Sequence, residues 1–310
     1  MNRTLPNGLS ISTEVAEALH ERRPVVALES TLLSHGLPPG RNLEVAHRLE
    51  RTVRDAGAVP ATIAVLDGTA LIGLSQSELD RVCAPDAGLE KLSLRDIGPA
   101  IGLGRSGATT VASTSALAHT AGIGVFATGG LGGVHLPAPG AAVTWDVSAD
   151  LGVLARVGTL VVCSGVKSVL DIAATLEVLE TNSVPVLGYR TDEFPAFYRR
   201  SSGFSVPLRV DDPAAVAAAV AAHRAVADSG VLLANPIPAE AEMAADLHDR
   251  LLAEGLELLR SRGVRGQDVT PVLLEHFHEG SGGVSLDANE ALVLANARLG
   301  AETAVELCAS

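Results

Sequence analysis

The sequence predicts an α/β protein with a mostly parallel central sheet that is covered by helices on both faces. Short apolar runs alternate with helical patterns along the whole chain, as expected for strands joined by crossover helices. Hydrophobic residues make up 47% of the sequence and aromatic residues only 3%, so we expect a core of small aliphatic layers. No low-complexity linker, charge block or clear internal repeat divides the chain, and we therefore expect residues 1–310 to form one domain.

Strand and helix patterns follow each other in a regular order. The apolar runs expected to be strands are 24–29, 61–66, 124–128, 159–164, 184–189, 206–210 and 231–234. The segments expected to be helices are 13–22, 43–56, 76–82, 113–121, 149–156, 169–181, 213–228, 239–261 and 286–299. The Gly- and Pro-rich segment 129–140 is expected to be a loop, because strand and helix patterns resume after it.

The net charge indicates which kinds of partner are excluded, and the cysteines indicate the cellular compartment. A formal net charge of −13 repels phosphate backbones, so we expect no nucleic-acid partner, although a locally positive pocket can still bind a small anion. Cys83, Cys163 and Cys308 lack metal-site spacing and cannot all pair, which indicates a reducing compartment. The first residues lack an apolar signal core, and no apolar run reaches membrane-spanning length. We expect a soluble, cytoplasmic protein.

The basic residues are unevenly distributed between arginine and lysine. Of the 23 basic residues, only Lys91 and Lys167 are lysines. Arginine stays protonated and is a poor nucleophile, whereas a desolvated lysine amine attacks carbonyl carbons. The pattern therefore favours a chemical role for at least one of the two lysines, and chance survival of both is the alternative.

Polar residues at the ends of the expected strands are the first candidates for a site. In open α/β sheets, ligands bind beyond the carboxyl ends of the strands. The residues at those ends are Glu29 and Ser30, Asp67, Thr128, Ser164 to Lys167, and Asn235.

Lys167 and Glu29 are the candidates for covalent and acid catalysis. Lys167 follows a buried strand and a glycine turn just before an expected helix, where a neutral amine suits Schiff-base formation. The alternative is a surface ion pair with Asp171. Glu29 ends an apolar strand, where burial would raise its pKa towards the range needed for general acid catalysis. The alternative is a carboxylate that caps a nearby loop or helix.

Three further segments carry polar or flexible residues suited to a ligand. Asp146 and Asp150 are four residues apart at an expected helix start, where they could hold a hard divalent ion, or Asp146 could simply be the N-cap. The hydroxyl-rich segment 107–114 could cradle a phosphate or supply ordinary caps. The glycine-rich segment from Thr128 to His135 either lets the backbone approach a ligand closely or is a mobile turn.

Together these segments resemble the pseudouridine-5′-phosphate glycosidase family, also called the indigoidine synthase A-like family. The resemblance runs from about Val25 to the last expected helix. It is carried by VVALESTLLSHGLP, GAVPATIAVLDG, GATTVAST, VFATGGLGGVH, WDVSADL, VVCSGVKSVLD, LGYRTDEFPAFY, ANPIP and SLDAN. So many long matches in one order are more specific than any single motif.

The resemblance implies a three-layer α/β/α sandwich that assembles as a homotrimer and uses one divalent metal ion per subunit, usually Mn²⁺. It implies a lyase with glycosidase activity that reversibly cleaves pseudouridine 5′-phosphate to uracil and ribose 5-phosphate. Lys167 matches the nucleophile that forms a Schiff base with the ring-opened ribose, Glu29 the proton donor, and Asp146 the metal ligand. The positions that match substrate-binding residues are Lys91, Val111, Ser148, Ala149 and Asp150, and we add Thr128, His135 and Asn289 as further candidates for the pocket.

Two rival functions use the same residues differently. A carbon–carbon glycosidic bond has no leaving oxygen or nitrogen to protonate, so two-carboxylate glycosidase chemistry is insufficient and a lysine imine is favoured. A Schiff-base aldolase acting on another sugar phosphate would use the same lysine. A sensor that binds ribose 5-phosphate without turnover would need none of the chemistry, and the joint presence of Lys167, Glu29 and Asp146 argues against it.

Overall fold

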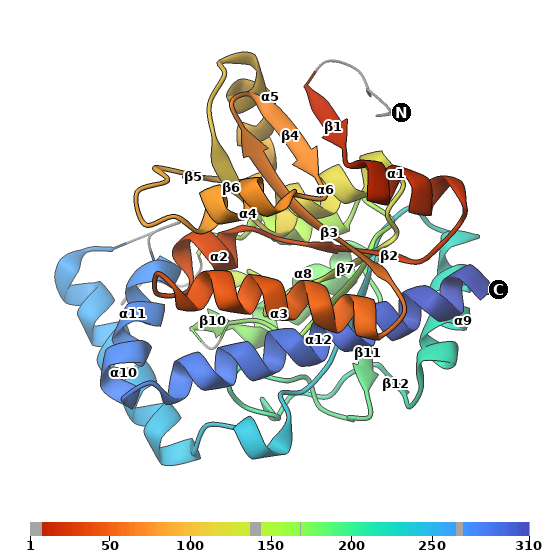
Figure 1. The fold of residues 1–310 in the computed structure, drawn as a ribbon. Helices are drawn as coiled ribbons and strands as arrows, with labels where there is room; N and C mark the ends of the chain where they lie inside the picture. Colours follow the sequence, from red (N-terminus) through yellow and green to blue (C-terminus); the bar gives the residue numbers. More distant parts are fainter. Residues whose placement is uncertain (1–7, 137–143, 168, 265–268, 310) are drawn as a thin grey trace.

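The fold is an alternation of strands and helices around one large sheet (Figure 1). The computed structural model describes residues 8–136, 144–167, 169–264 and 269–309. The strands are β1 (Leu9–Ile11), β2 (Val25–Leu28), β3 (Val59–Leu66), β4 (Thr69–Ile72), β5 (Glu90–Leu92), β6 (Gly107–Thr109), β7 (Val125–Ala127), β8 (Val134–His135), β9 (Leu160–Cys163), β10 (Leu170–Asp171), β11 (Val186–Tyr189), β12 (Leu208–Val210) and β13 (Val231–Ala234).

The helices lie between these strands and extend past the last one. They are α1 (Thr13–His20), α2 (Thr31–His35), α3 (Arg41–Asp55), α4 (Gln76–Cys83), α5 (Leu94–Gly102), α6 (Val111–Ala121), α7 (Ala149–Leu154), α8 (Ile172–Thr181), α9 (Pro213–Arg224), the 3₁₀ turn η1 (Ala239–Ala241), α10 (Ala245–Arg262), α11 (Val269–Ser281) and α12 (Val284–Ala309). None of the helices in the described part of the chain is long and apolar enough to cross a membrane.

The central part of the sheet is parallel, as predicted. The strand order is β1-β4-β3-β2-β7-β9-β13-β11-β12, and all pairs from β3 to β12 in this order are parallel. Antiparallel pairs occur where β4 and β6 join β3. The short strands β8 and β10 form a separate antiparallel pair. Because the central strands are parallel, their carboxyl ends meet at one edge, where a ligand site is expected.

Helices cover both faces of the sheet and give it three layers. On one face, residues such as Val26, Val125 and Val162 pack against α3, α9 and α12. On the other face, the alternate residues Ala27, Phe126 and Val161 pack against α1, α6, α7 and α8. Strands buried on both faces read as continuous apolar runs, which is why the sequence revealed them. The expected α/β/α sandwich is therefore what the structure has.

The element boundaries differ from the expectations mainly at two places. The expected helix 239–261 is interrupted, because η1 ends at Ala241 and α10 begins at Ala245. In the gap, the Glu242 carboxylate accepts a hydrogen bond from the backbone N–H of Arg200, and the Met243 N–H donates to the carbonyl of Tyr198. These long-range contacts hold residues 242–244 extended. The last helix, α12, continues to Ala309 rather than ending at 299.

Candidate active site

A pocket lies at the carboxyl ends of the parallel strands, and about 520 Å³ of space within it is not filled by atoms, a volume that includes open solvent. It is bounded by the strand ends and by α2, α11 and α12. Its lining residues are Glu29, Thr31, Leu32, His35, Gly36, Lys91, Gly129, Gly130, Lys167, Phe197, Pro271, Leu274 and Asn289. The acid, both lysines and an amide are thus gathered from distant parts of the chain.

Glu29 is placed in the pocket by β2, whose four residues are all buried. Its carboxylate accepts a hydrogen bond from the Thr128 hydroxyl at the end of the neighbouring strand β7. Burial raises the pKa of Glu29, while the charge of Lys167 and the Thr128 hydrogen bond act in the opposite direction. The N-cap of the following helix α2 is Ser30, so Glu29 is available as a proton donor rather than a cap.

Lys167 stands in the loop that follows β9, beside Glu29. The loop turns at Gly165, whose φ is +79°. The backbone N–H of Lys167 donates to the carbonyl of Leu131 in the glycine-rich segment, at 3.3 Å. Helix α8 begins only at Ile172, with Asp171 as its N-cap, so Lys167 does not lie at the helix start as expected. Asp171 accepts a hydrogen bond from the N–H of Ala174 at 2.9 Å, and among the described residues it forms no ion pair with Lys167, so the structure does not support the ion-pair alternative for that lysine.

Lys91 reaches the same pocket from β5. Its charge acts on Glu29, lowering the pKa of that carboxyl against the larger effect of burial. Burial and the charge of Lys91 lower the pKa of His35, which lines the pocket from α2. Lys91, together with Lys167 while that lysine is protonated, gives the pocket the local positive charge that an anionic ligand needs in a chain of net charge −13.

His135 and Asp146 lie next to this cluster and next to each other. The His135 Nδ1 is 3.9 Å from the Asp146 Oδ2, and the His135 N–H donates to the Asp146 carbonyl at 2.9 Å. Burial lowers the pKa of His135, Asp146 opposes this shift, and Lys167 and Lys91 add to it. Asp146 does not cap α7, because the N-cap is Ser148.

Asp150 is a structural link rather than a partner of Asp146. Its buried carboxylate accepts hydrogen bonds from the N–H groups of Ala112 and Gly132, each at 2.9 Å. The Asp150 carboxylate therefore accepts a hydrogen bond from a backbone N–H in the first turn of α6, and the hydroxyls of Thr110 and Ser113 act as caps there. These contacts fit the capping alternative for segment 107–114 and lock the glycine-rich segment to α6.

Comparisons with known proteins show the family of the chain. The sequence model of the family described as Indigoidine synthase A like protein matches residues 14–306. The chain belongs to this family. It is 54% identical over 294 residues to the pseudouridine-5′-phosphate glycosidase of Salinispora tropica, covering 94% of this chain and 90% of that protein. It is 51% identical over 302 residues to the pseudouridine-5′-phosphate glycosidase of Symbiobacterium thermophilum, covering 96% and 97%.

Two solved structures have the same fold. The prealnumycin C-glycosynthase AlnA, in complex with ribulose 5-phosphate, superposes with a TM-score of 0.89 at 41% identity, covering 98% of both chains. An indigoidine synthase A-like protein from Thermotoga maritima superposes with a TM-score of 0.86 at 35% identity, covering 99% of both chains.

The residues expected from the family resemblance fall into two groups. Glu29, Lys91, Lys167 and Asn289 line the pocket, and Thr128 bonds directly to Glu29. Asn289 is 3% exposed, and its side-chain oxygen has no hydrogen-bond partner within the described residues, as expected of an acceptor reserved for a ligand. The others lie outside the lining: Val111 is in the core, Asp150 links α6 to the glycine-rich segment, and Ser148 and Ala149 border a separate surface hollow with Leu94 and Arg95.

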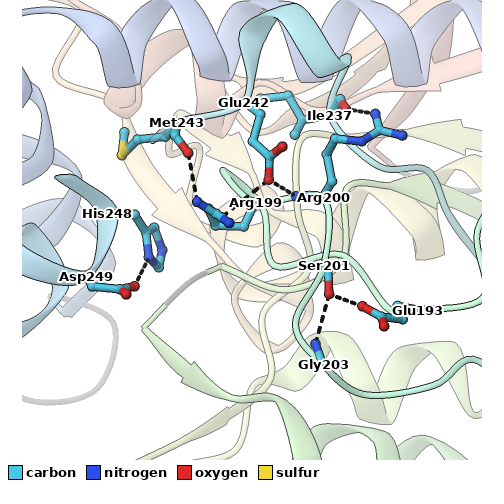
Figure 2. Close-up of polar contacts among 10 residues, drawn as sticks. All are labelled: Glu193, Arg199, Arg200, Ser201, Gly203, Ile237, Glu242, Met243, His248 and Asp249. Atoms are coloured by element: carbon cyan, nitrogen blue, oxygen red, sulfur yellow. Dashed lines mark hydrogen bonds and ion pairs between the residues drawn. The ribbon is translucent and has the colours of Figure 1, made fainter. Parts of the chain in front are cut away.

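Sequence reasoning did not single out Phe197, which forms one wall of the pocket. Its backbone has a φ of +60°, an unfavourable conformation for a bulky residue, and its N–H donates to the carbonyl of Ser164 at 2.9 Å. Figure 2 shows how the following residues are held: Arg200 donates to the Ile237 carbonyl at 2.6 Å, and Arg199 to the Met243 carbonyl at 3.1 Å. The local sequence gives no signal for this conformation, because distant contacts impose it.

Proposed function

We propose that the chain is a pseudouridine-5′-phosphate glycosidase that cleaves a carbon–carbon glycosidic bond through a covalent lysine adduct. The observation that carries the proposal is the proximity of Lys167 and a buried Glu29 in one pocket, in a chain that is 54% identical to a protein of that name. The two groups supply a nucleophile and a proton donor whose pKa is raised by burial.

Ring opening and attack by the lysine form the first stage of the proposed reaction. The C1′–O4′ bond breaks with electrons supplied by the pyrimidine ring, and O4′ takes a proton from Glu29. The neutral amine of Lys167 then adds to C1′, and the electron pair of the C1′=C5 bond formed on ring opening returns to the pyrimidine ring. The resulting ammonium returns a proton to Glu29, which is beside it, so that the carboxyl is again protonated.

Cleavage and hydrolysis form the second stage. The lone pair of the Lys167 nitrogen forms a C=N bond to C1′, and the C1′–C5 bond breaks with its electron pair passing to C5 of the pyrimidine. C5 takes the proton of Glu29, which completes uracil. Water adds to the iminium carbon and gives a proton to the Glu29 carboxylate. The lysine amine then leaves, and the aldehyde of ribose 5-phosphate is released. We assign Lys91 to the phosphate group, because it is the second cation of the pocket.

The metal ion is a separate part of the proposal. Among the described residues no group of three or more His, Cys, Asp or Glu side chains could hold an ion. Asp146 offers a carboxylate that is 42% exposed, which fits a hard, largely hydrated cation such as Mn²⁺ bound through one carboxylate and water. When bound there, the ion would supply positive charge for the anionic substrate.

We also propose that the chain assembles as a homotrimer in the cytoplasm. Leu136, Trp145 and Val147 flank the paired residues His135 and Asp146 in the sequence and are all exposed, Trp145 to 94%. Exposed large apolar side chains that gather on one surface are typical of a protein interface. The three cysteines are free thiols, which supports a reducing compartment. Light scattering of the purified protein tests the trimer, and a monomeric mass would contradict it.

Uracil release from pseudouridine 5′-phosphate tests the reaction. Wild-type protein with Mn²⁺ should release uracil, and Lys167→Ala and Lys167→Arg should both lose more than about 10³-fold in kcat, because guanidinium keeps the charge without the nucleophile. Full activity of Lys167→Arg would contradict the covalent role. Turnover of other sugar phosphates without uracil release would instead support the aldolase, and binding without turnover would support the sensor.

Carbon–carbon bond formation is the second candidate, and one observation favours it. The solved structure with a TM-score of 0.89 and 41% identity is that of a C-glycosynthase. The same lysine imine run in reverse joins a pyrimidine carbon to C1′, with Glu29 accepting the proton that C5 loses. Incubation of uracil and ribose 5-phosphate with the protein, followed by chromatography for the C-nucleotide, measures this direction.

A further inference from the structure

Asn296 lies on α12, where three parallel strands of the sheet end. It is fully buried. Gly300, one helical turn later, allows the close approach, because a Cβ at that position would stand 3.3 Å from the Cβ of Ala127 on β7. The Asn296 amide therefore reaches the strand ends that carry the candidate catalytic loops.

The amide of Asn296 joins the residues that follow β7, β9 and β13. Its Nδ2 donates to the carbonyl of Thr128 at 2.8 Å, to that of Gly129 at 3.4 Å and to the hydroxyl of Ser164 at 3.1 Å. Its Oδ1 accepts from the Nδ2 of Asn235 at 2.9 Å and from the Ser164 hydroxyl at 3.4 Å. The orientation of the amide follows from these partners, since backbone carbonyls only accept.

Two of these partners lead directly to the catalytic side chains. Thr128 donates its own hydroxyl to Glu29. Ser164 begins the loop to Lys167, and this loop is tied back to the glycine-rich segment by hydrogen bonds from Leu131 N–H to the Gly165 carbonyl at 2.9 Å and from Lys167 N–H to the Leu131 carbonyl at 3.3 Å. A shift of the Asn296 amide would therefore be transmitted to both groups.

We infer that Asn296 is a positioning residue that sets Glu29 and Lys167 against each other by holding the loops after β7 and β9 to α12. The inference rests on the proposed function. A buried amide with all its partners also stabilises the fold, so stability loss alone does not distinguish the two roles. A loss of rate does distinguish the two roles, because a misplacement of the reacting groups by about 1 Å costs about 10²-fold in rate.

Three variants test separately the connection from Asn296 to Glu29 through Thr128 and the connection to Lys167 through Ser164. Asn296→Ala should lower kcat by about 10²-fold with little change in KM. It should also move the Glu29 limb of the pH–rate profile upward, because a loosened Thr128 hydroxyl no longer lowers the pKa of that carboxyl, which Lys167, Lys91 and Asp150 also face. Thr128→Val should move this limb, and Ser164→Ala should slow borohydride trapping of ribose 5-phosphate on Lys167.

Ser229→Ala is the matched control. Ser229 is buried to 5% exposure and donates to the Ser183 carbonyl at 2.7 Å, but it lies before β13, at the opposite edge of the sheet. The control should lose stability and keep both the pH profile and the trapping rate of the wild type.

Two results would overturn the inference. One is a folded Asn296→Ala variant with wild-type pH profile and trapping rate. The other is a wild-type pH profile of Thr128→Val together with a wild-type trapping rate of Ser164→Ala. This second result applies even if Asn296→Ala does not fold. Failure of the proposed function itself is distinguishable, because the wild-type protein would then release no uracil and form no lysine adduct.

Discussion

A methyl group at Gly165 is expected to damage both stability and activity. A Cβ there would lie 1.9 Å from the carbonyl oxygen of Pro195 and 2.8 Å from its carbon, so a backbone segment has to move. That segment is fixed by the hydrogen bonds from Phe194 N–H to the Phe204 carbonyl at 2.7 Å and from Phe197 N–H to the Ser164 carbonyl at 2.9 Å.

The magnitude follows from two contributions. A left-handed backbone costs an L-residue roughly 1–2 kcal/mol, and forced overpacking costs roughly 1–3 kcal/mol more. Gly165→Ala should therefore lower the free energy of unfolding by about 2–5 kcal/mol, a large part of the roughly 5–15 kcal/mol of a typical domain. The displaced loop carries Lys167, so activity of the folded fraction should fall as well.

Gly203 offers a control with the same backbone conformation. Its φ is also +79°, its N–H bonds the Ser201 hydroxyl (Figure 2), and a Cβ there would meet nothing within 4 Å. Gly203→Ala should cost only about 1–2 kcal/mol and keep full activity. Urea unfolding and uracil release measure both variants, and equal losses of stability and activity in the two would refute the steric argument.

Three other substitutions test the remaining roles. Glu29→Gln should abolish turnover. A carboxyl whose folded-state pKa is raised contributes stability that is lost as pH rises through that pKa, so the variant should gain stability relative to wild type as pH rises above the ordinary carboxyl pKa of 4.5; melting curves that stay parallel would contradict this. Asp146→Asn should weaken Mn²⁺ binding in calorimetry, whereas Asp86→Asn, at an exposed position, should not. Equal Mn²⁺ affinity of the two variants would show that Asp146 is not the metal ligand. Lys91→Met should raise the KM for the phosphorylated substrate more than Lys91→Arg, and identical values would contradict the phosphate assignment.

The central strands could be predicted because burial on both faces leaves a continuous apolar run. The run 231–234 is strand β13 to the residue, and 24–29 differs from β2 only at its ends. Short elements such as α2 and the β8–β10 pair were missed, since so few residues carry no periodicity. The interruption before α10 depends on contacts of Glu242 with a distant segment, which a local pattern does not contain.

The candidate site could be predicted where a residue's chemistry is unusual for its place. Glu29 at the end of an apolar strand and Lys167 among so few lysines are of this kind, and both line the pocket. The sequence left open whether Asp146 and Asp150 hold one ion together or Asp146 caps a helix. Neither alternative describes the structure, because the N-cap is Ser148 and the Asp150 carboxylate accepts hydrogen bonds from backbone N–H groups. Asn296 resembles any buried polar residue until its partners on three strands are known.

Borohydride trapping with ribose 5-phosphate tests the covalent role of Lys167 most directly. The protein is incubated with the sugar phosphate and Mn²⁺, reduced, and analysed by intact mass and peptide mapping. We expect one ribose phosphate per chain, on Lys167, and none in Lys167→Arg. An adduct on Lys91, or no adduct on folded wild-type protein that still releases uracil, would contradict it.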